Sequence, residues 1–179
     1  MNNQIYQHLK SEYDSFYSEI MRKGKLPMWS TQTGFWNASL SDEIFAAFKK
    51  LNLNEFKNFL DLGSGDGKVT MLAGLFCENA EGVEIDPMLH LKAIEVKNKF
   101  NARNVHFHNK DFMHHDLKDY DAIFISPDAP LERGVERKLL QELNGKLILF
   151  GNHFHPKILQ KEKGFRGTHN LVAVYSNLK

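Results

Sequence analysis

The residues that most clearly indicate a binding or catalytic role lie in the stretch 59–67, which reads FLDLGSGDG. A short apolar run leads there into three alternating glycines, Gly63, Gly65 and Gly67, and then directly into a stretch of helical character. Glycines lack a Cβ atom, so they adopt left-handed backbone angles and let a ligand lie against the main chain. The N-terminus of the following helix adds oriented N–H groups that suit a carboxylate or a phosphate. The pattern therefore predicts a ligand-binding loop.

An acidic partner for this loop is Glu84, in the sequence GVEID at residues 82–86. An acid at the tip of the neighbouring strand is placed to accept hydrogen bonds from both hydroxyls of a ribose. A dinucleotide and S-adenosylmethionine (SAM) both fit a glycine loop with such an acid. The dinucleotide fingerprint, however, requires its last glycine or alanine where this chain has Lys68. Asp61 and Asp66 would also repel a diphosphate but attract the ammonium and sulfonium of SAM, so we predict SAM.

Two further residues are candidates for catalysis because they follow later strands. A sulfonium-bound methyl group is already activated, so the protein mainly has to hold a nucleophile in line with it at about 3 Å. A general base is needed only where the acceptor must lose a proton. Open α/β sheets bind ligands at the carboxyl ends of their strands, where the sequence places Asp128 and His153. The structural alternatives are a helix N-cap for Asp128 and an exposed strand end for His153.

Histidines are frequent, but we expect no metal site. Three pairs lie one or two residues apart, at 106 and 108, 114 and 115, and 153 and 155. Residues two apart on a strand share a face and could chelate. No Asp, Glu or Cys accompanies these pairs at a recognisable metal-ligand spacing. The single cysteine, Cys77, leaves no partner for an internal disulfide.

The hydrophobic pattern predicts the elements that position these groups. From residue 56 onward, short apolar runs alternate with helical stretches, as is typical of parallel strands joined by right-handed crossovers. We expect strands at 58–62, 82–85, 105–108, 120–126, 146–151 and 171–175, and helices at 68–76, 87–100 and 131–143. Residues 165–169 are a candidate hairpin partner for the last strand.

The N-terminal third has a different pattern. Apolar residues at spacings of three and four predict a helix over the first ~25 residues. Residues 21–37 are expected to form an ordered loop that carries Trp29 and Trp36, and a second helix opens near Ser39 and runs to about Leu51. We therefore expect one domain, with a helical or lid-forming extension at 1–55 and a Rossmann-like core at 56–179.

Composition agrees with a globular protein. The 179 residues are 42% hydrophobic and 25% charged, and the formal net charge is +1. This charge argues against a chain-wide cationic surface for nucleic acid or membrane binding. The N-terminus has no charged start followed by an apolar run, and no stretch reaches the ~18 apolar residues of a membrane span. We therefore expect a cytoplasmic protein with no membrane partner.

Four segments together resemble the class I SAM-dependent methyltransferases. DLGSGDG at 61–67 is similar to their motif I, GVEID at 82–86 to motif II and KDF at 110–112 to the third motif, while YDAIFISPD at 120–128 stands where motif IV stands. The resemblance covers about 56–151 in order and spacing. It implies a three-layer Rossmann-like α/β fold with a mostly parallel seven-stranded sheet whose last strand is antiparallel, preceded by N-terminal helices.

The resemblance also implies which residues bind the cofactor. The loop would surround the methionine moiety, and Glu84 would hold the ribose. Ile85 would pack on the adenine, whose amino edge would meet Asp111 and Phe112. The implied cofactor residues are Asp61, Gly63, Ser64, Gly65, Gly67, Glu84, Ile85, Asp111 and Phe112.

Motif IV departs from one common form. Methyltransferases of nucleic-acid or glutamine amides usually carry Asn/Asp-Pro-Pro-aromatic there, whereas this chain has SPDA at 126–129. The missing aromatic would stack a flipped base. The arrangement is more similar to small archaeal-type members and, distantly, to seven-strand protein-lysine methyltransferases. We favour a protein lysine amine as acceptor, held by Asp128 and a tryptophan ring, with S-adenosylhomocysteine as product. A small-molecule or RNA acceptor, a non-catalytic SAM- or nucleotide-binding module and a short-chain oxidoreductase are the alternatives.

Overall fold

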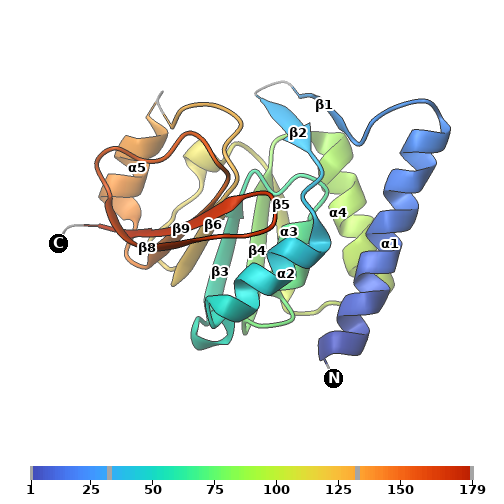
Figure 1. Cartoon of the computed structure of the whole chain (residues 1–179), viewed down its shortest axis with the longest axis horizontal. Coiled ribbons are helices and arrows are strands. Elements are labelled where there is room, and N and C mark those ends of the chain that lie inside the picture. The colour runs from blue at the N-terminus through green and yellow to red at the C-terminus, as the bar shows by residue number, and fades with distance from the viewer. Residues whose placement is uncertain (1, 32–33, 132–133, 178–179) are drawn as a thin grey trace.

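A computed structural model of the chain describes residues 2–31, 34–131 and 134–177. Its centre is a seven-stranded sheet in the order β5-β4-β3-β6-β7-β9-β8 (Figure 1). Within this sheet the five neighbouring strands from β5 to β7 pair in parallel, and β9 runs antiparallel to both β7 and β8. The predicted sheet, with its last strand antiparallel, is therefore confirmed. The strands are β3 (Asn58–Leu62), β4 (Asn79–Glu84), β5 (Val105–Asn109), β6 (Ala122–Ile125), β7 (Lys146–Phe150), β8 (Gln160–Arg166) and β9 (Leu171–Ser176).

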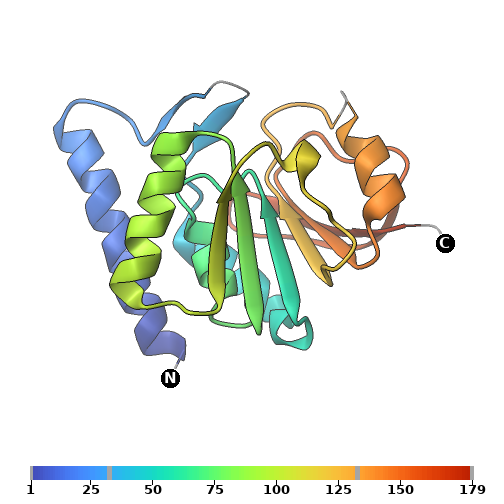
Figure 2. The same ribbon diagram turned by 180° about the vertical axis from the view of Figure 1, so that it is seen from behind.

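Helices cover both faces of the sheet, which gives three layers (Figures 1 and 2). One face packs against α1 (Asn2–Arg22), α2 (Ser41–Lys50), α3 (Lys68–Ala73) and α4 (Pro87–Phe100), and the other against α5 (Val135–Glu142). Two short 3₁₀ turns, Leu53–Glu55 and Phe112–His114, complete the described helical elements. No helix among these residues is long and apolar enough to cross a membrane.

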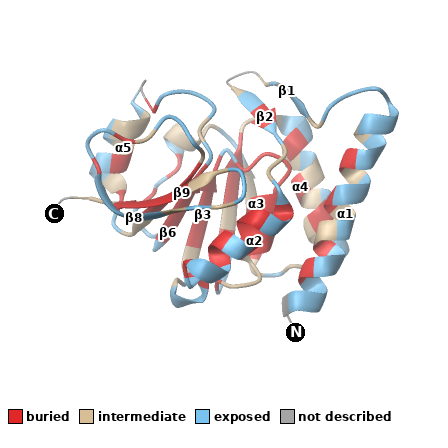
Figure 3. Cartoon of the chain, viewed as in Figure 1, coloured by how far each residue is buried: buried red, intermediate tan, exposed pale blue. Residues whose placement is uncertain are grey.

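Side-chain alternation along the strands assigns residues to two cores. On β3, Phe59 faces the core of the four-helix side, whereas Leu60 and Leu62 face the core under α5. Phe59 and Phe124 both meet the ring of Phe48 on α2 at centroid distances of 5.6 and 6.0 Å. Figure 3 shows the central strands of the sheet buried, whereas the edge strand β8 and the outer faces of the helices are exposed. Burying each of these rings contributes about 1.5–3 kcal/mol to folding, so the sheet that carries the predicted loop is firmly supported.

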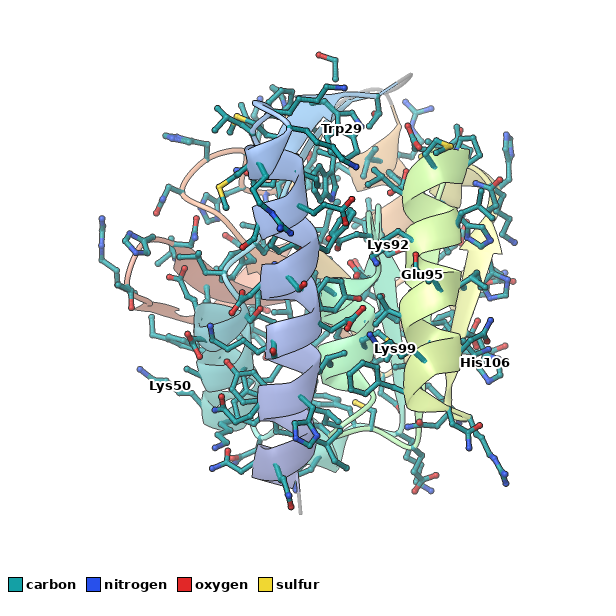
Figure 4. The ribbon with its side chains drawn as sticks, turned by 90° about the vertical axis from the view of Figure 1, so that its right-hand side faces the viewer. Trp29, Lys50, Lys92, Glu95, Lys99 and His106 are labelled. Carbon is teal, nitrogen blue, oxygen red and sulfur yellow. The ribbon has the colours of Figure 1, made fainter. Side chains whose placement is uncertain are left out.

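The two longest helices, α1 and α4, lie side by side at the β5 end of the sheet. The ammonium group of Lys92 lies 4.6 Å from the ring centroid of Phe16, and Lys99 pairs with Glu12. Figure 4 shows both lysines directed from α4 toward α1. Exposed ion pairs contribute little to stability, so the main attachment of α1 comes from its buried face, with Tyr6, Leu9, Tyr13 and Tyr17.

Several predicted bounds were wrong, each for an identifiable reason. The strands β1 (Met28–Ser30) and β2 (Phe35–Asn37) pair antiparallel as a hairpin, where we expected a loop. Each has three residues, too few for a visible alternation, and Thr31 bonds to Gly34 beside them. The hairpin partner of the last strand is β8 (Gln160–Arg166), which overlaps the predicted 165–169 only at residues 165 and 166. Its earlier start was missed because an exposed edge strand needs no apolar pattern. The helix α3 ends at Ala73, with Gly74 as its C-cap.

Candidate active site

A cleft of about 1060 Å³ opens at the carboxyl ends of the parallel strands. The last residues of β3, β4, β6 and β7 all line it: Leu62, Glu84, Ile125 and Phe150. The glycine loop, the segments 111–113 and 126–131, and the hairpin residues 34–37 complete most of its wall. This volume slightly exceeds the ~300–1,000 Å³ of small-molecule sites, so it is large enough for a cofactor and part of a second substrate.

The glycine loop has the conformation that its sequence predicts. Gly63 and Gly65 have φ angles of +75° and +56°, which side chains rarely adopt. The N–H groups of Gly63 and Ser64 both donate to the carbonyl of Val83, at 2.9 and 3.0 Å, which ties the loop to β4. A Cβ atom on Gly63 would meet no atom within 4 Å. The loop therefore leaves open space where a ligand can approach its backbone.

Gly67 lies outside the residues that line the cleft. Its φ angle is +81°, and a Cβ atom there would lie 2.6 Å from the side chains of both Ala93 and Phe107. The third glycine of the motif thus lets the loop pack against α4 and β5. Sequence reasoning grouped it with the cofactor residues because it belongs to the same motif.

Asp61, at the carboxyl end of β3, is buried and accepts a hydrogen bond of 2.9 Å from the Thr70 hydroxyl. Burial raises its pKa to about 7; the Thr70 bond opposes this rise, and the nearby carboxylates of Glu84 and Asp66 add to it. Because burial disfavours the charged form of Asp61, a cationic ligand beside it would strongly stabilise the carboxylate. Asp61 lines the cleft, as expected.

Glu84 joins the glycine loop to the end of β4. One carboxylate oxygen accepts from the Gly65 N–H at 2.8 Å, and the other accepts from the Asp86 N–H at 2.8 Å. Burial raises the pKa of Glu84, and these two backbone bonds oppose the rise. Each carboxylate oxygen has a second lone pair, so the group can still accept bonds from a ligand in the cleft.

The predicted adenine residues also line the cleft. Ile85 follows Glu84 directly, and Asp111 and Phe112 come from the segment after β5. Asp111 caps the 3₁₀ turn by accepting from the Met113 N–H at 2.8 Å. Phe112 packs on the core under α5. The structure thus brings the residues at the end of β4 and those after β5, which are separate in the sequence, to one cleft.

The two candidate catalytic residues lie in different surroundings. Asp128 lines the cleft, and its carboxylate accepts a hydrogen bond from the backbone N–H of Phe35. This bond ties the hairpin to the segment after β6. His153 is exposed and is not among the residues that line the cleft. Its neighbour His155 bonds the Tyr175 hydroxyl at 2.7 Å on the same side of the molecule.

Some cleft residues gave little or no signal in the sequence. Trp36 is buried directly on the glycine loop, because a Cβ atom on Gly65 would lie 2.6 Å from its indole. Phe150, the last residue of β7, and Asn170, just before β9, also line the cleft. Their residue types have no motif spacing that points to a ligand. The tryptophan in a glycine- and proline-containing segment was the one available signal.

The charges of the cleft are mostly negative. Among the described lining residues there are five carboxyl groups but a single ammonium group, that of Lys68. The carboxyl groups are those of Asp61, Asp66, Glu84, Asp111 and Asp128. Lys68 is buried and donates to the carbonyl of Ser39, and burial lowers its pKa. Such a cleft favours cations over phosphate-bearing ligands. Within residues 2–31, 34–131 and 134–177, no three His, Cys, Asp or Glu side chains could hold a metal ion.

The sequence of this site matches a known family. A family model described as "Histone methylation protein DOT1" matches residues 36–133, more than half of the chain. The match includes the glycine loop, Glu84, Asp111 and Asp128. The chain belongs to the DOT1 family. It is a SAM-dependent methyltransferase, as the sequence motifs predicted. No curated protein matches this DOT1-family chain.

Solved structures share the fold of this DOT1-family chain. An RNA methyltransferase from Salinibacter ruber in complex with S-adenosyl-L-homocysteine has a TM-score of 0.70 at 17% identity, covering 80% of this chain and 95% of that one. The putative methyltransferase yhhF from Escherichia coli has 0.63 at 16%, covering 79% and 88%. A Pyrococcus abyssi tRNA (uracil-54, C5)-methyltransferase, also with S-adenosyl-L-homocysteine, has 0.65 at 16%, covering 78% and 40%. These likenesses confirm the predicted Rossmann-like fold.

Proposed function

We propose that this enzyme transfers the methyl group of SAM to a cationic amine side chain of a protein, with lysine as the acceptor. The observation that carries this proposal is the charge of the cleft, in which five carboxyl groups face a single buried ammonium among the described lining residues. Both SAM and a protonated lysine are cations. A nucleic acid would bring phosphates into the same field, which costs energy.

The cofactor would occupy the part of the cleft between the glycine loop and Phe112. The residues present fit SAM, because Asp61 supplies a carboxylate for its ammonium and Glu84 one for its ribose hydroxyls. The open space above Gly63 admits the ligand against the backbone. Ile85 and Phe112 offer apolar contact for the adenine, and Asp111 an acceptor for its amino group.

When bound, SAM supplies a methyl group already activated by the sulfonium. The protein's task is then to bring the acceptor nitrogen into line and keep water out. The acceptor would enter through the remaining part of the cleft, which Phe35 and Asp128 border. Asp128 would attract the ammonium group, and the Phe35 N–H bond fixes the carboxylate for this role.

Lysine must lose its proton before it attacks, because only the neutral amine has a lone pair. Its ordinary pKa of ~10.4 leaves little neutral amine at pH 7. Entry into a partly apolar cleft lowers that pKa by desolvation, whereas the carboxylates of the cleft raise it. Exposed His153 is not among the residues that line the cleft, so we assign it no role as a base. We expect the proton to pass to solvent, and the rate should then rise between about pH 7 and pH 9.

The acceptor class can be tested directly with SAM that carries a labelled methyl group. The full chain is incubated with this SAM and a fractionated cell extract. We expect label in material that protease digests and ribonuclease does not, and methyl-lysine after acid hydrolysis. The variant Asp128→Asn should lower this labelling, and Asp119→Asn, at an exposed position outside the cleft lining, is its matched control. Label in RNA, or only in a dialysable metabolite, would contradict the lysine proposal.

A further inference from the structure

Asp66, in the middle of the glycine loop, has a side chain that the proposed SAM contacts do not use. It lies between Gly65 and Gly67 and is only 3% exposed. One carboxylate oxygen accepts from the Tyr17 hydroxyl at 2.5 Å, and the other accepts from the backbone N–H of Lys68 at 3.2 Å. A buried carboxylate needs such partners, and one of them comes from the first helix of the chain.

Two tyrosines of α1 hold this part of the loop. Tyr13 and Tyr17 are four residues apart, so they share one face of the helix. The Tyr13 hydroxyl donates to the backbone carbonyl of Asp66 at 3.2 Å, while that of Tyr17 donates to its carboxylate. Burial, together with the nearby Asp66 charge, raises the pKa of both tyrosines above the ordinary range. Both hydroxyls therefore stay protonated and can donate throughout the working pH range.

Lys68 completes the buried cluster. Its ammonium group lies 4.5 Å from the ring centroid of Tyr17 and donates to the carbonyl of Ser39. Burial raises the pKa of Asp66, whereas the positive charge of Lys68 and the Tyr17 bond oppose the rise. The cluster thus links the loop to α1 and to Ser39, two residues before α2 begins.

The loop needs this outside support because of its own composition. Gly63, Gly65 and Gly67 all have positive φ angles within five residues. Glycine has more backbone freedom to lose on ordering than any other residue. A loop that is already ordered in the free protein binds its ligand more tightly than one that must be ordered during binding. The contacts from α1 supply that order in advance.

We propose that α1 pre-organises the glycine loop for SAM, and that Tyr17 is a positioning residue that acts through Asp66. This inference rests on the proposed cofactor site at the loop. Tyr17 is not among the residues that line the cleft, so its effect must be indirect. The whole of α1 also lies outside the stretch that matches the DOT1 family, because that stretch begins at residue 36.

The test is Tyr17→Phe in the full chain, which removes one hydroxyl and keeps the ring. Calorimetric titration with SAM should give a Kd about tenfold higher than that of the parent, as expected for the loss of a hydrogen bond to a charged group. The KM for SAM should rise with it, while kcat at saturating SAM stays unchanged. Tyr6→Phe is the matched control, because Tyr6 is a buried tyrosine of the same helix whose hydroxyl bonds Asp42 instead. It should leave the Kd unchanged.

Amide hydrogen exchange of the SAM-free protein gives a readout independent of activity. In Tyr17→Phe the amides of residues 63–67 should exchange faster than in the parent, whereas those of α1 keep their protection. A double-mutant cycle tests the route. If Tyr17 acts through the Asp66 carboxylate, Tyr17→Phe should raise the Kd no further in an Asp66→Ala background, which has no side-chain acceptor for the Tyr17 hydroxyl. Tyr13→Phe removes only the bond to the Asp66 carbonyl, and it should raise the Kd in the same direction.

The outcomes separate this inference from the proposed cofactor site. If Asp61→Asn weakens SAM binding but Tyr17→Phe and Tyr13→Phe do not, α1 has no positioning role and the inference is overturned. If neither Asp61→Asn nor Tyr17→Phe changes the Kd, the cofactor site itself has been assigned wrongly. Loss of α1 protection in Tyr17→Phe would show a helix that detaches as a whole, and would also overturn a role through Asp66 alone.

Discussion

Replacing Asp61 by asparagine should make the SAM-free protein more stable while it weakens SAM binding. Asparagine has nearly the same shape, and its side-chain oxygen can still accept the bond from Thr70. What changes is the charge, which asparagine lacks at every pH. If Asp61 serves to bind a cationic ligand and not to stabilise the fold, its replacement should raise the free energy of unfolding and lower the affinity for SAM.

The size of the stability gain follows from the pKa of Asp61. Burial, with smaller contributions from Glu84 and Asp66, raises it from 3.8 to about 7. The folded protein then holds this proton more tightly than the unfolded chain does. The free energy of unfolding therefore falls as the pH rises from about 4 to about 7, and it stays low above that range. At about 1.4 kcal/mol per pKa unit, the ionised carboxylate costs on the order of 4 kcal/mol above pH 7.

Urea unfolding of both proteins over the range from about pH 5 to about pH 8 measures this cost. The difference in free energy of unfolding should grow in favour of Asp61→Asn up to about pH 7 and then level off. Calorimetry at about pH 8 should show weaker SAM binding for the variant. Asp119→Asn, at an exposed position, should show no pH-dependent difference from the parent. A variant that is less stable than the parent throughout, or a difference that does not change with pH, would refute the reasoning.

Three other substitutions test separate parts of the site. Glu84→Gln should raise the Kd for SAM by about tenfold or more, because it removes the negative charge of the acceptor for the ribose hydroxyls and the Gly65 N–H. An unchanged calorimetric Kd would exclude Glu84 from the ribose site. Gly67→Ala should lower the free energy of unfolding by roughly 1–3 kcal/mol, since φ is +81° and the new methyl would meet Phe107 at 2.6 Å; urea unfolding unaffected by the change would contradict that packing. Asp128→Asn should lower kcat/KM for the acceptor more than it changes the Kd for SAM, and equal effects on both would place Asp128 in the cofactor site instead.

The sheet could be predicted from sequence wherever a strand is buried on both faces. The bounds of β3, Asn58–Leu62, are those expected, because an apolar run there meets a glycine loop. The helix α4, Pro87–Phe100, was also predicted to the residue, since Asp86 caps its start and proline occupies its first turn. The exposed strand β8 and the short hairpin had no such pattern. Their positions depend on pairing partners elsewhere in the chain.

The candidate site was predictable where a single motif carries it. Asp61 and Glu84 lie at the carboxyl ends of adjacent parallel strands, so topology alone brings them together. The position of Gly67 against Phe107 depends on how α4 and β5 pack, which the motif does not contain. The contact between Trp36 and Gly65 likewise joins segments that no spacing rule relates. Sequence motifs report chemistry within a loop, whereas the surroundings of the loop depend on tertiary packing.

The attachment of α1 to the glycine loop has a consequence for how this protein folds during its synthesis. Asp66 follows Tyr17 by 49 positions and Tyr13 by 53. On the ribosome, where domains begin to fold from their N-terminal side, α1 is therefore made well before β3 and the glycine loop. Until β3 and the loop have been synthesised, the apolar face of α1 is exposed to water or bound by a chaperone. Such long-range contacts also slow folding, so the nascent chain has its greatest exposure to aggregation while its first helix is complete and its first parallel strand is not.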